Sequence, residues 1–228
     1  MTKDFDKQLR MFPTPEIRAQ AEAFFEKYWF NTDEYKEKWL SIQNSIFDHQ
    51  AKHLPDLMFN DNYELLPLEG GNIFTSKEDF STLQRCMREV GDNSFAVVEN
   101  ERVVIKFYDP EGGWGVTPFL RFKFPSEVSW EELMSGDPIS VLLFQVQGAI
   151  KDYFVFGDGG NWGRYVANDY ANPTAAPLFS TPLNIMGFKK EYSEVFRKNY
   201  EHLIKPEIIS DWLPDTYKVR LKHEAHKS

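Results

Sequence analysis

The chain has a single cysteine, Cys86, among its 228 residues, so it cannot form a disulfide within itself. Long chains without disulfides are typical of reducing compartments, which favours a cytoplasmic location. Long apolar runs are missing as well. The first residues lack the apolar core of a signal peptide, and the longest apolar run elsewhere, residues 139–146, is too short to cross a bilayer. The sequence therefore predicts a cytoplasmic protein without a membrane partner.

Basic residues are few relative to acidic ones, with 26 Lys and Arg against 35 Asp and Glu and a net charge of −9. A negative charge repels polyanions, which argues against nucleic acid as a partner. The same charge would speed association with a basic protein. It also serves plain solubility, so charge alone does not identify a partner.

Aromatic residues are abundant, at 16% of the chain, and Phe alone accounts for 20 residues. A chain of this length and composition can bury one large hydrophobic core. We expect a single domain over residues 1–228. Within it we expect a helical N-terminal extension (1–74), an α+β core (75–204) and a polar tail (214–228).

Helical signals dominate the first 90 residues. Thr14 can cap a helix that begins with Pro15, and overlapping capping boxes at Thr75 and Ser76 precede an amphipathic run that ends at Gly91. The helices expected from apolar spacing span residues 15–30, 33–54, 77–90 and 189–204. The first two should form an αα-hairpin, and residues 56–74 should form a connector without regular structure.

Beyond Gly91 the apolar period changes from helical to alternating, which predicts β-strands between about residues 94 and 187. We expect one hairpin over 94–108, another over 153–168 and a half-buried strand over 117–124, joined by short links that favour antiparallel pairing. The predicted fold class is α+β, in which N-terminal helices pack on a mainly antiparallel sheet with a C-terminal helix. The side chains expected in the core are Phe24, Trp39, Phe80, Leu83, Phe122, Phe154, Phe156 and Phe196.

Two glycine-rich segments place a tryptophan in a turn, with Trp114 in residues 111–115 and Trp162 in residues 159–163. Exposed backbone N–H groups beside an indole face could bind a sugar or a nucleotide. Alternatively, glycine supplies the positive φ of a turn, and the tryptophan plugs the end of the hairpin. Neither segment has the Lys and Ser or Thr of a phosphate-binding loop, so no NTPase is indicated.

Acidic residues gather around the second hairpin, where Asp152, Asp158 and Asp169 lie near Asn161 and Arg164. Two carboxylates across a cleft could serve general acid–base hydrolysis of a glycoside. Aspartate in turns more often hydrogen-bonds nearby backbone. We therefore assign no catalytic residue.

Other reactive side chains lack the partners that chemistry requires. His49 and His53 would share one helical face, but no third ligand lies nearby in the sequence. Cys86 has no evident activating neighbour, so we expect a buried structural thiol. The sequence predicts neither a metal site nor a cofactor.

Residues 152–169 read Asp-Tyr-Phe-Val-Phe-Gly-Asp-Gly-Gly-Asn-Trp-Gly-Arg-Tyr-Val-Ala-Asn-Asp. This run resembles the late hairpin of the SMI1/KNR4-like (SUKH) superfamily, in which a strand ending in Phe-Gly or Phe-Ala leads through Asp and Gly into a strand ending in Asp. The resemblance covers about residues 75–204 and implies helices packed on a mainly antiparallel sheet. Many bacterial members are immunity proteins that neutralise a toxin, often a nuclease, by direct contact, which implies a non-enzymatic role.

The sequence thus predicts a non-enzymatic protein-binding module, with a basic toxin as the partner that the resemblance and the charge suggest. The expected binding residues are Trp114, Asp158, Asn161, Trp162, Arg164 and Asp169. The alternative is a small hydrolase or carbohydrate-binding protein that uses Trp114, Trp162 and nearby carboxylates. A pocket lined by both indoles, with carboxyl groups about 5 to 9 Å apart, would favour the alternative.

Overall fold

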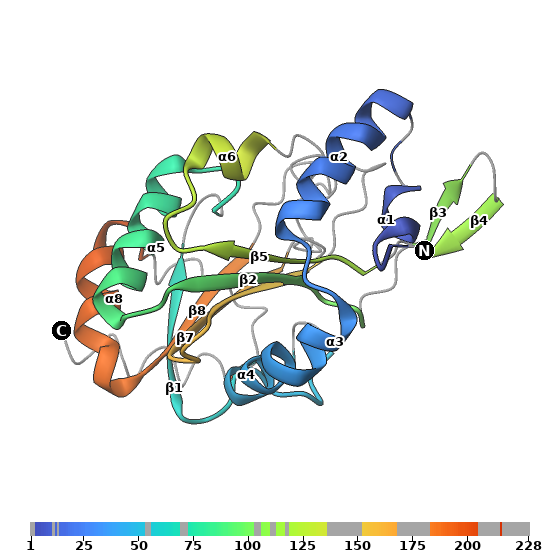
Figure 1. Ribbon diagram of the computed structural model, residues 1–228. Helices are drawn as coiled ribbons and strands as arrows, with labels where there is room; N and C mark the ends of the chain where they lie inside the picture. Colours follow the sequence, from blue (N-terminus) through green and yellow to red (C-terminus); the bar gives the residue numbers. More distant parts are fainter. Residues whose placement is uncertain are drawn as a thin grey trace, which may run out of the picture.

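The structure, a computed structural model, describes residues 3–10, 12, 14–52, 56–68, 73–102, 106–109, 113–116, 119–135, 152–167, 183–204 and 215. It confirms the α+β class, because helices pack on a six-stranded antiparallel sheet with the strand order β1-β8-β7-β6-β2-β5 (Figure 1). A separate two-stranded sheet pairs β3 with β4. The strands are β1 (Tyr63–Leu68), β2 (Ser94–Glu99), β3 (Lys106–Asp109), β4 (Gly113–Val116), β5 (Arg121–Pro125), β6 (Tyr153–Gly157), β7 (Trp162–Ala167) and β8 (Leu183–Lys189).

The helices begin and end largely where local sequence signals place them. Thr14 Oγ1 accepts a hydrogen bond from the Ile17 N–H, Ser76 Oγ accepts one from the Asp79 N–H, and Gly91 ends its helix at φ 83°. The α-helices are α1 (Asp6–Leu9), α2 (Pro15–Tyr28), α3 (Thr32–Glu34), α4 (Leu40–Ile46), α5 (Lys77–Val90), α6 (Trp130–Ser135) and α8 (Ser193–Tyr200). The π-helix η1 (Tyr35–Trp39) joins α3 to α4, and the 3₁₀ turns η3 (Lys190–Tyr192) and η4 (Glu201–Leu203) flank α8.

Helices cover both faces of the six-stranded sheet. One core lies between the sheet and α2, α5, α6 and α8, and the other lies between the sheet and the segment from α3 to α4 (Figure 1). Side chains of β2 alternate between the two cores, with Phe95 and Val97 in the first and Ala96 and Val98 in the second. All the side chains predicted for the core are buried.

The first two predicted helices do not form an αα-hairpin. Phe24 and Phe25 of α2 pack against Phe122 of β5 in the first core, whereas Trp39 lies in the second core, on the other face of the sheet. The second helical segment is also shorter than the predicted 33–54. It ends at Ile46, because Phe47 is extended and its ring packs on that of Phe59, 4.9 Å away.

Strand β1 corrects two expectations, that residues 56–74 lack regular structure and that all strands lie between residues 94 and 187. It pairs antiparallel with β8, with Leu65 opposite Gly187. β1 contains Pro67, and it is an edge strand of the sheet, the position that tolerates proline. The sheet therefore takes one edge from the segment that was predicted to be an irregular connector.

The predicted hairpin over residues 94–108 is also wrong. Both edges of β2 are occupied, by β5 on one side and β6 on the other, and β3 pairs with β4 instead. The Asn100 N–H continues the contact with the β6 side by donating to the Asp152 carbonyl at 2.7 Å. The second hairpin is confirmed, since β6 and β7 pair antiparallel.

Some expectations fall on residues outside the described ranges, namely the apolar run 139–146 and, apart from Asp215, the tail 214–228. No helix among the described residues is both long enough and apolar enough to span a membrane.

Phe156→Ala should lower the free energy of unfolding by roughly 3 to 5 kcal/mol. Phe156 is fully buried, and its ring lies 5.9 Å from that of Trp39, so truncation leaves a cavity between the sheet and η1. Urea unfolding of the wild type and the variant measures the change. The exposed Glu127→Ala serves as a control, and a loss below about 1 kcal/mol for Phe156→Ala would show that this face of β6 is wrongly assigned.

Candidate functional site

Trp162 and Arg164, two of the predicted binding residues, lie inside the protein. Both side chains are 0% exposed. The Trp162 indole N–H donates to Asp92 Oδ2 at 2.6 Å, and the ring lies 6.2 Å from that of Phe196 in α8. Trp162 therefore plugs the end of the hairpin, which was one of the two interpretations of the glycine-rich segment, and neither side chain is open to a partner here.

Two aspartates join the β6–β7 turn to the turn after α5, because the carboxylate of each accepts a hydrogen bond from a backbone N–H of the other turn. Asp92 Oδ1 accepts from the Gly159 N–H at 3.0 Å, and Asp158 Oδ1 accepts from the Asn93 N–H at 3.2 Å. Asp158 Oδ2 also accepts from the Ser94 hydroxyl at 2.8 Å. The half-buried Asp158 is thus held by hydrogen bonds within the protein.

The glycines of this turn make room for the Asp92 carboxylate. A Cβ at Gly157 would lie 1.9 Å from Asp92 Oδ2, and a Cβ at Gly159 would lie 2.5 Å from Asp92 Oδ1. Asn161 follows, half-buried, and its Oδ1 accepts from Lys189 Nζ at 3.1 Å. The glycine-rich segment therefore has a structural purpose, the close approach of a buried carboxylate.

The pKa of Asp92 is raised to about 6. Burial is the largest cause, and the charge of the neighbouring Asp158 carboxylate acts in the same direction. Hydrogen bonds from the Trp162 indole and the Gly159 N–H act in the opposite direction, because they favour the charged form. The turn thus holds a carboxyl group that takes up a proton at mildly acidic pH.

Arg164 forms a bidentate ion pair with Asp79 of α5. Its two terminal nitrogens donate to the two carboxylate oxygens at 2.8 and 2.7 Å, and its Nε donates to Asn184 Oδ1 at 3.3 Å. Burial would lower the pKa of the Arg164 guanidinium, but the Asp79 carboxylate outweighs burial and raises it. The Arg164 guanidinium therefore remains charged inside the first core.

The predicted binding residues and the nearby carboxylates that the structure describes do not lie together in one pocket. Asp152 and Asp158 flank opposite ends of β6, which separates them by roughly 20 Å at the usual rise of an extended chain. The Asp152 carboxylate accepts from the buried Tyr165 hydroxyl. Trp114 belongs to β4, which projects beside the N-terminus, away from the end of the sheet near α5 and α8 (Figure 1). Asp169 lies outside the described residues.

A small cleft, absent from the sequence predictions, opens between α4 and the C-terminal end of β2. Its volume is about 50 Å³. Aromatic side chains supply much of its lining, from Tyr35, Phe47, Phe119 and Phe154. These residues come from four separate parts of the chain, which is why the sequence alone did not associate them.

Charged groups of both signs also line the cleft, with acidic ones in excess. The carboxylates are those of Asp48, Glu99 and Glu101, and the basic groups are His49 and Arg102. Glu99 is buried and its Oε2 accepts from the Leu120 N–H at 3.0 Å, whereas Glu101 is exposed. The buried carboxylate lies in the wall, and the exposed one lies toward solvent.

The β2–β3 loop is fastened to the segment after α4 at this cleft. The Arg102 guanidinium donates to the backbone carbonyls of His49 and Ala51. Asp48, with its side chain 44% exposed, accepts from the Gln50 N–H at 2.8 Å. The Arg102 hydrogen bonds join the two rims of the cleft.

Tyr35 opens the π-helix η1 and projects into the same cleft. Its hydroxyl donates to Gln43 Oε1 at 2.8 Å, and burial, reinforced by the charge of Glu101, raises its pKa, so the phenol stays neutral. Single-turn π-helices are rare and often occur at functional sites. The local backbone thus supports the cleft as a candidate site.

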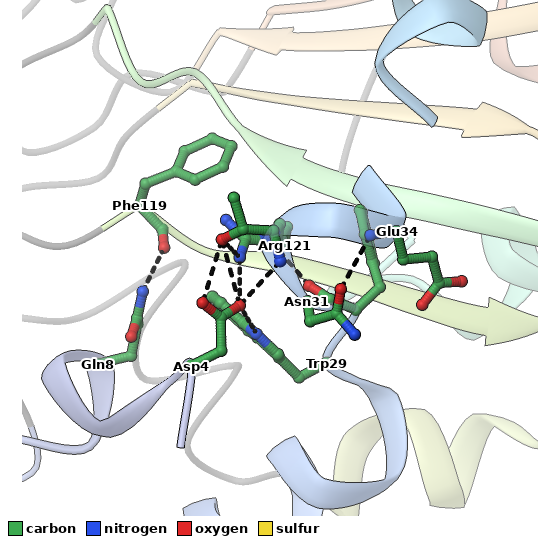
Figure 2. A network of polar contacts seen from close by, with 9 residues as sticks. Asp4, Gln8, Trp29, Asn31, Glu34, Phe119 and Arg121 are labelled. Atoms are coloured by element: carbon green, nitrogen blue, oxygen red, sulfur yellow. Dashed lines mark hydrogen bonds and ion pairs between the residues drawn. The ribbon is translucent and has the colours of Figure 1, made fainter. Parts of the chain in front are cut away.

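Arg121 of β5, close to Phe119, anchors the N-terminal segment to the sheet (Figure 2). Its Nη2 donates to Asp4 Oδ2 at 2.5 Å and its Nε donates to the Phe30 carbonyl at 2.7 Å. The guanidinium carbon lies 4.6 Å from the centroid of Trp29 and 5.8 Å from those of Tyr35 and Phe119. The network combines a carboxylate with aromatic faces around one arginine.

The Asp4 carboxylate is held in its charged form within this network. Burial would raise its pKa, but hydrogen bonds from Trp29 and Thr32, together with the charge of Arg121, lower it below the usual value. The N-terminal segment is therefore fastened to β5 most firmly when Asp4 is ionised.

The remaining candidates for chemistry are structural or incomplete. Among the described residues no three His, Cys, Asp or Glu side chains group as metal ligands. His49 lies at the cleft rim, and His53 lies outside the described residues. Cys86 is buried as expected, and burial raises the pKa of its thiol to about 12, which keeps it in the unreactive protonated form.

Asp79→Asn should lower the free energy of unfolding by about 3 to 5 kcal/mol, because it leaves the buried Arg164 guanidinium without its counter-charge. The double variant Asp79→Leu/Arg164→Met removes both charges and should lose less than the single variant does. Urea unfolding of the three proteins at neutral pH measures the difference. Equal stability of Asp79→Asn and the wild type would contradict the assigned ion pair.

Asp92→Asn should change how stability depends on pH. The native pKa of about 6 lies above the ordinary value of 3.8, so the native carboxyl retains a proton that the unfolded one loses. The contribution of Asp92 to wild-type stability therefore falls as pH rises from about 4 to about 6, and the loss persists above that range. Relative to the wild type, the free energy of unfolding of Asp92→Asn should rise by up to about 3 kcal/mol over this range, as measured by urea unfolding at a series of pH values.

Trp162→Phe provides the matched comparison, because it removes the indole donor that lowers the pKa of Asp92. In that variant the fall in stability should move to higher pH. A difference between Asp92→Asn and the wild type that is independent of pH would contradict the raised pKa.

No protein-family model, curated protein or solved structure matches this chain.

Proposed function

We propose that this chain is a non-enzymatic protein-binding module, and that it acts as an immunity protein of the SMI1/KNR4-like type that neutralises a basic toxin. The observation that carries the proposal is the cleft between α4 and β2, where aromatic rings and carboxylates lie together. Pockets that receive a partner's anchor side chain, surrounded by a polar rim, are typical of the centre of protein–protein interfaces.

The size of the cleft favours a protein partner over a small-molecule substrate. Its volume is about 50 Å³, whereas pockets that enclose small ligands usually measure about 300 to 1,000 Å³. A cleft of this size admits part of one side chain, while the rest of the partner lies against the surrounding surface.

The hydrogen bonding of the aspartates also favours binding over hydrolysis. Asp92 and Asp158 accept hydrogen bonds from backbone N–H groups, and Asp152 accepts from the Tyr165 hydroxyl. Carboxylates engaged in this way stabilise turns and strands. The acidic cluster that suggested a hydrolase is thus better explained as part of the fold.

Co-expression provides the test, because the net charge of −9 should attract a basic partner over long range. The chain should restore growth to cells that express a basic toxin encoded beside its gene, and the two purified proteins should bind in isothermal titration calorimetry. Since opposite charges speed the encounter, the association rate should fall at least tenfold between about 50 and about 500 mM NaCl.

The proposal would be contradicted if co-expression failed to relieve growth arrest and if the chain bound no basic protein encoded by the adjoining genes. Hydrolysis of a glycoside or an ester by the purified chain, lost in Asp158→Asn, would replace it with the enzymatic alternative.

A further inference from the structure

The cleft between α4 and β2 combines two features that suit a cation. Tyr35, Phe47 and Phe119 present aromatic side chains, and Glu99 and Glu101 contribute carboxylates. Aromatic faces attract cations through their quadrupole, and a carboxylate adds charge-assisted hydrogen bonds. An uncharged or acidic group would gain neither interaction.

We infer that this cleft receives one arginine side chain of the basic partner, an inference that rests on the proposed protein-binding function. The volume agrees with a guanidinium group. A cavity needs roughly 10 to 15 Å³ for each water-sized group, so about 50 Å³ holds three to five of them. A guanidinium has four heavy atoms.

The protein already uses two of the same rings for its own arginine. The Arg121 guanidinium lies 5.8 Å from the centroids of both Tyr35 and Phe119, and it also pairs with the Asp4 carboxylate (Figure 2). The neighbouring cleft repeats this combination of aromatic rings and carboxylates, and the Arg102 guanidinium at its rim is bonded to backbone carbonyls. Arginine is favoured over lysine because a planar guanidinium stacks on aromatic faces and is more weakly hydrated.

The charges that face the cleft leave a net attraction for a cation. Asp48, Glu99 and Glu101 are acidic, and Arg102 is the permanent positive charge at the rim. Arg102 directs its guanidinium to the backbone carbonyls of His49 and Ala51, so its hydrogen-bonding capacity is used in part within the protein. Arg121, 5.8 Å from the centroids of Tyr35 and Phe119, is paired with Asp4.

Nuclear magnetic resonance with a defined probe tests the inference. The peptide acetyl-Gly-Gly-Arg-Gly-Gly-amide should shift the backbone amides of residues 47–49 and 99–102 in a saturable manner. The citrulline peptide has the same shape but no charge, and it should leave these amides unshifted. The lysine peptide should bind more weakly than the arginine peptide.

Glu101→Gln should lower the affinity for the arginine peptide about three- to fivefold, since the substitution removes one exposed charge and keeps the side-chain shape. Glu127→Gln is the matched control, because Glu127 is also exposed but lies near the opposite end of β2 and β5. The double variant Glu101→Gln/Asp48→Asn should weaken binding by roughly tenfold.

Equal binding of the citrulline peptide, equal binding of the lysine peptide, or unchanged affinity in Glu101→Gln would overturn the inference. A toxin that binds wild type and the double variant with the same affinity would also overturn it, while leaving the proposed function intact. Conversely, specific seating of the arginine peptide without any basic protein partner would support the arginine site and contradict the immunity function.

Discussion

The buried ion pair between Arg164 and Asp79 determines how α5 sits on the sheet. Hydrophobic side chains alone would accept several positions of a helix, but an unpaired charge in the core costs several kcal/mol. Only the register that brings Asp79 to the Arg164 guanidinium, at 2.7 and 2.8 Å, avoids this cost. The pair therefore specifies the arrangement, while the surrounding aromatic core supplies most of the stabilisation.

The position of α5 in turn determines what happens at one end of the sheet. Gly91 ends the helix and directs Asp92 toward the β6–β7 turn, where its carboxylate fits against Gly157 and Gly159. The reciprocal caps formed by Asp92 and Asp158 occupy the polar groups of both turns. This end of the sheet is closed by internal bonds, although it carries the residues with the most distinctive sequence pattern.

A cleft lies at the opposite end of β2, next to the end of α4. α4 ends at Ile46, where Phe47 packs against Phe59, and aromatic rings together with Asp48, Glu99 and Glu101 border the cleft there. Tyr35, the first residue of the π-helix, lines the same cleft, and its ring centroid lies 5.8 Å from the Arg121 guanidinium carbon. The π-helix and the end of α4 thus both supply aromatic side chains to the cleft on which the proposed function depends.

Local signals in the sequence determined the elements whose cause is local: the caps at Thr14, Ser76 and Gly91, the β6–β7 hairpin and the identity of the core side chains. The sequence did not indicate which residues that are distant along the chain would pair with each other. Nothing near Ser94 indicates that β2 pairs with β5 and β6. Strand β1 was not predicted, and it contains Pro67, which an edge strand tolerates. Likewise, the residues of the cleft come from segments more than 100 positions apart, and Trp162 and Arg164 looked like surface anchors because their buried partners, Asp92 and Asp79, lie 70 and 85 positions away. Composition and periodicity report which side chains leave water, but only tertiary packing decides which of them meet.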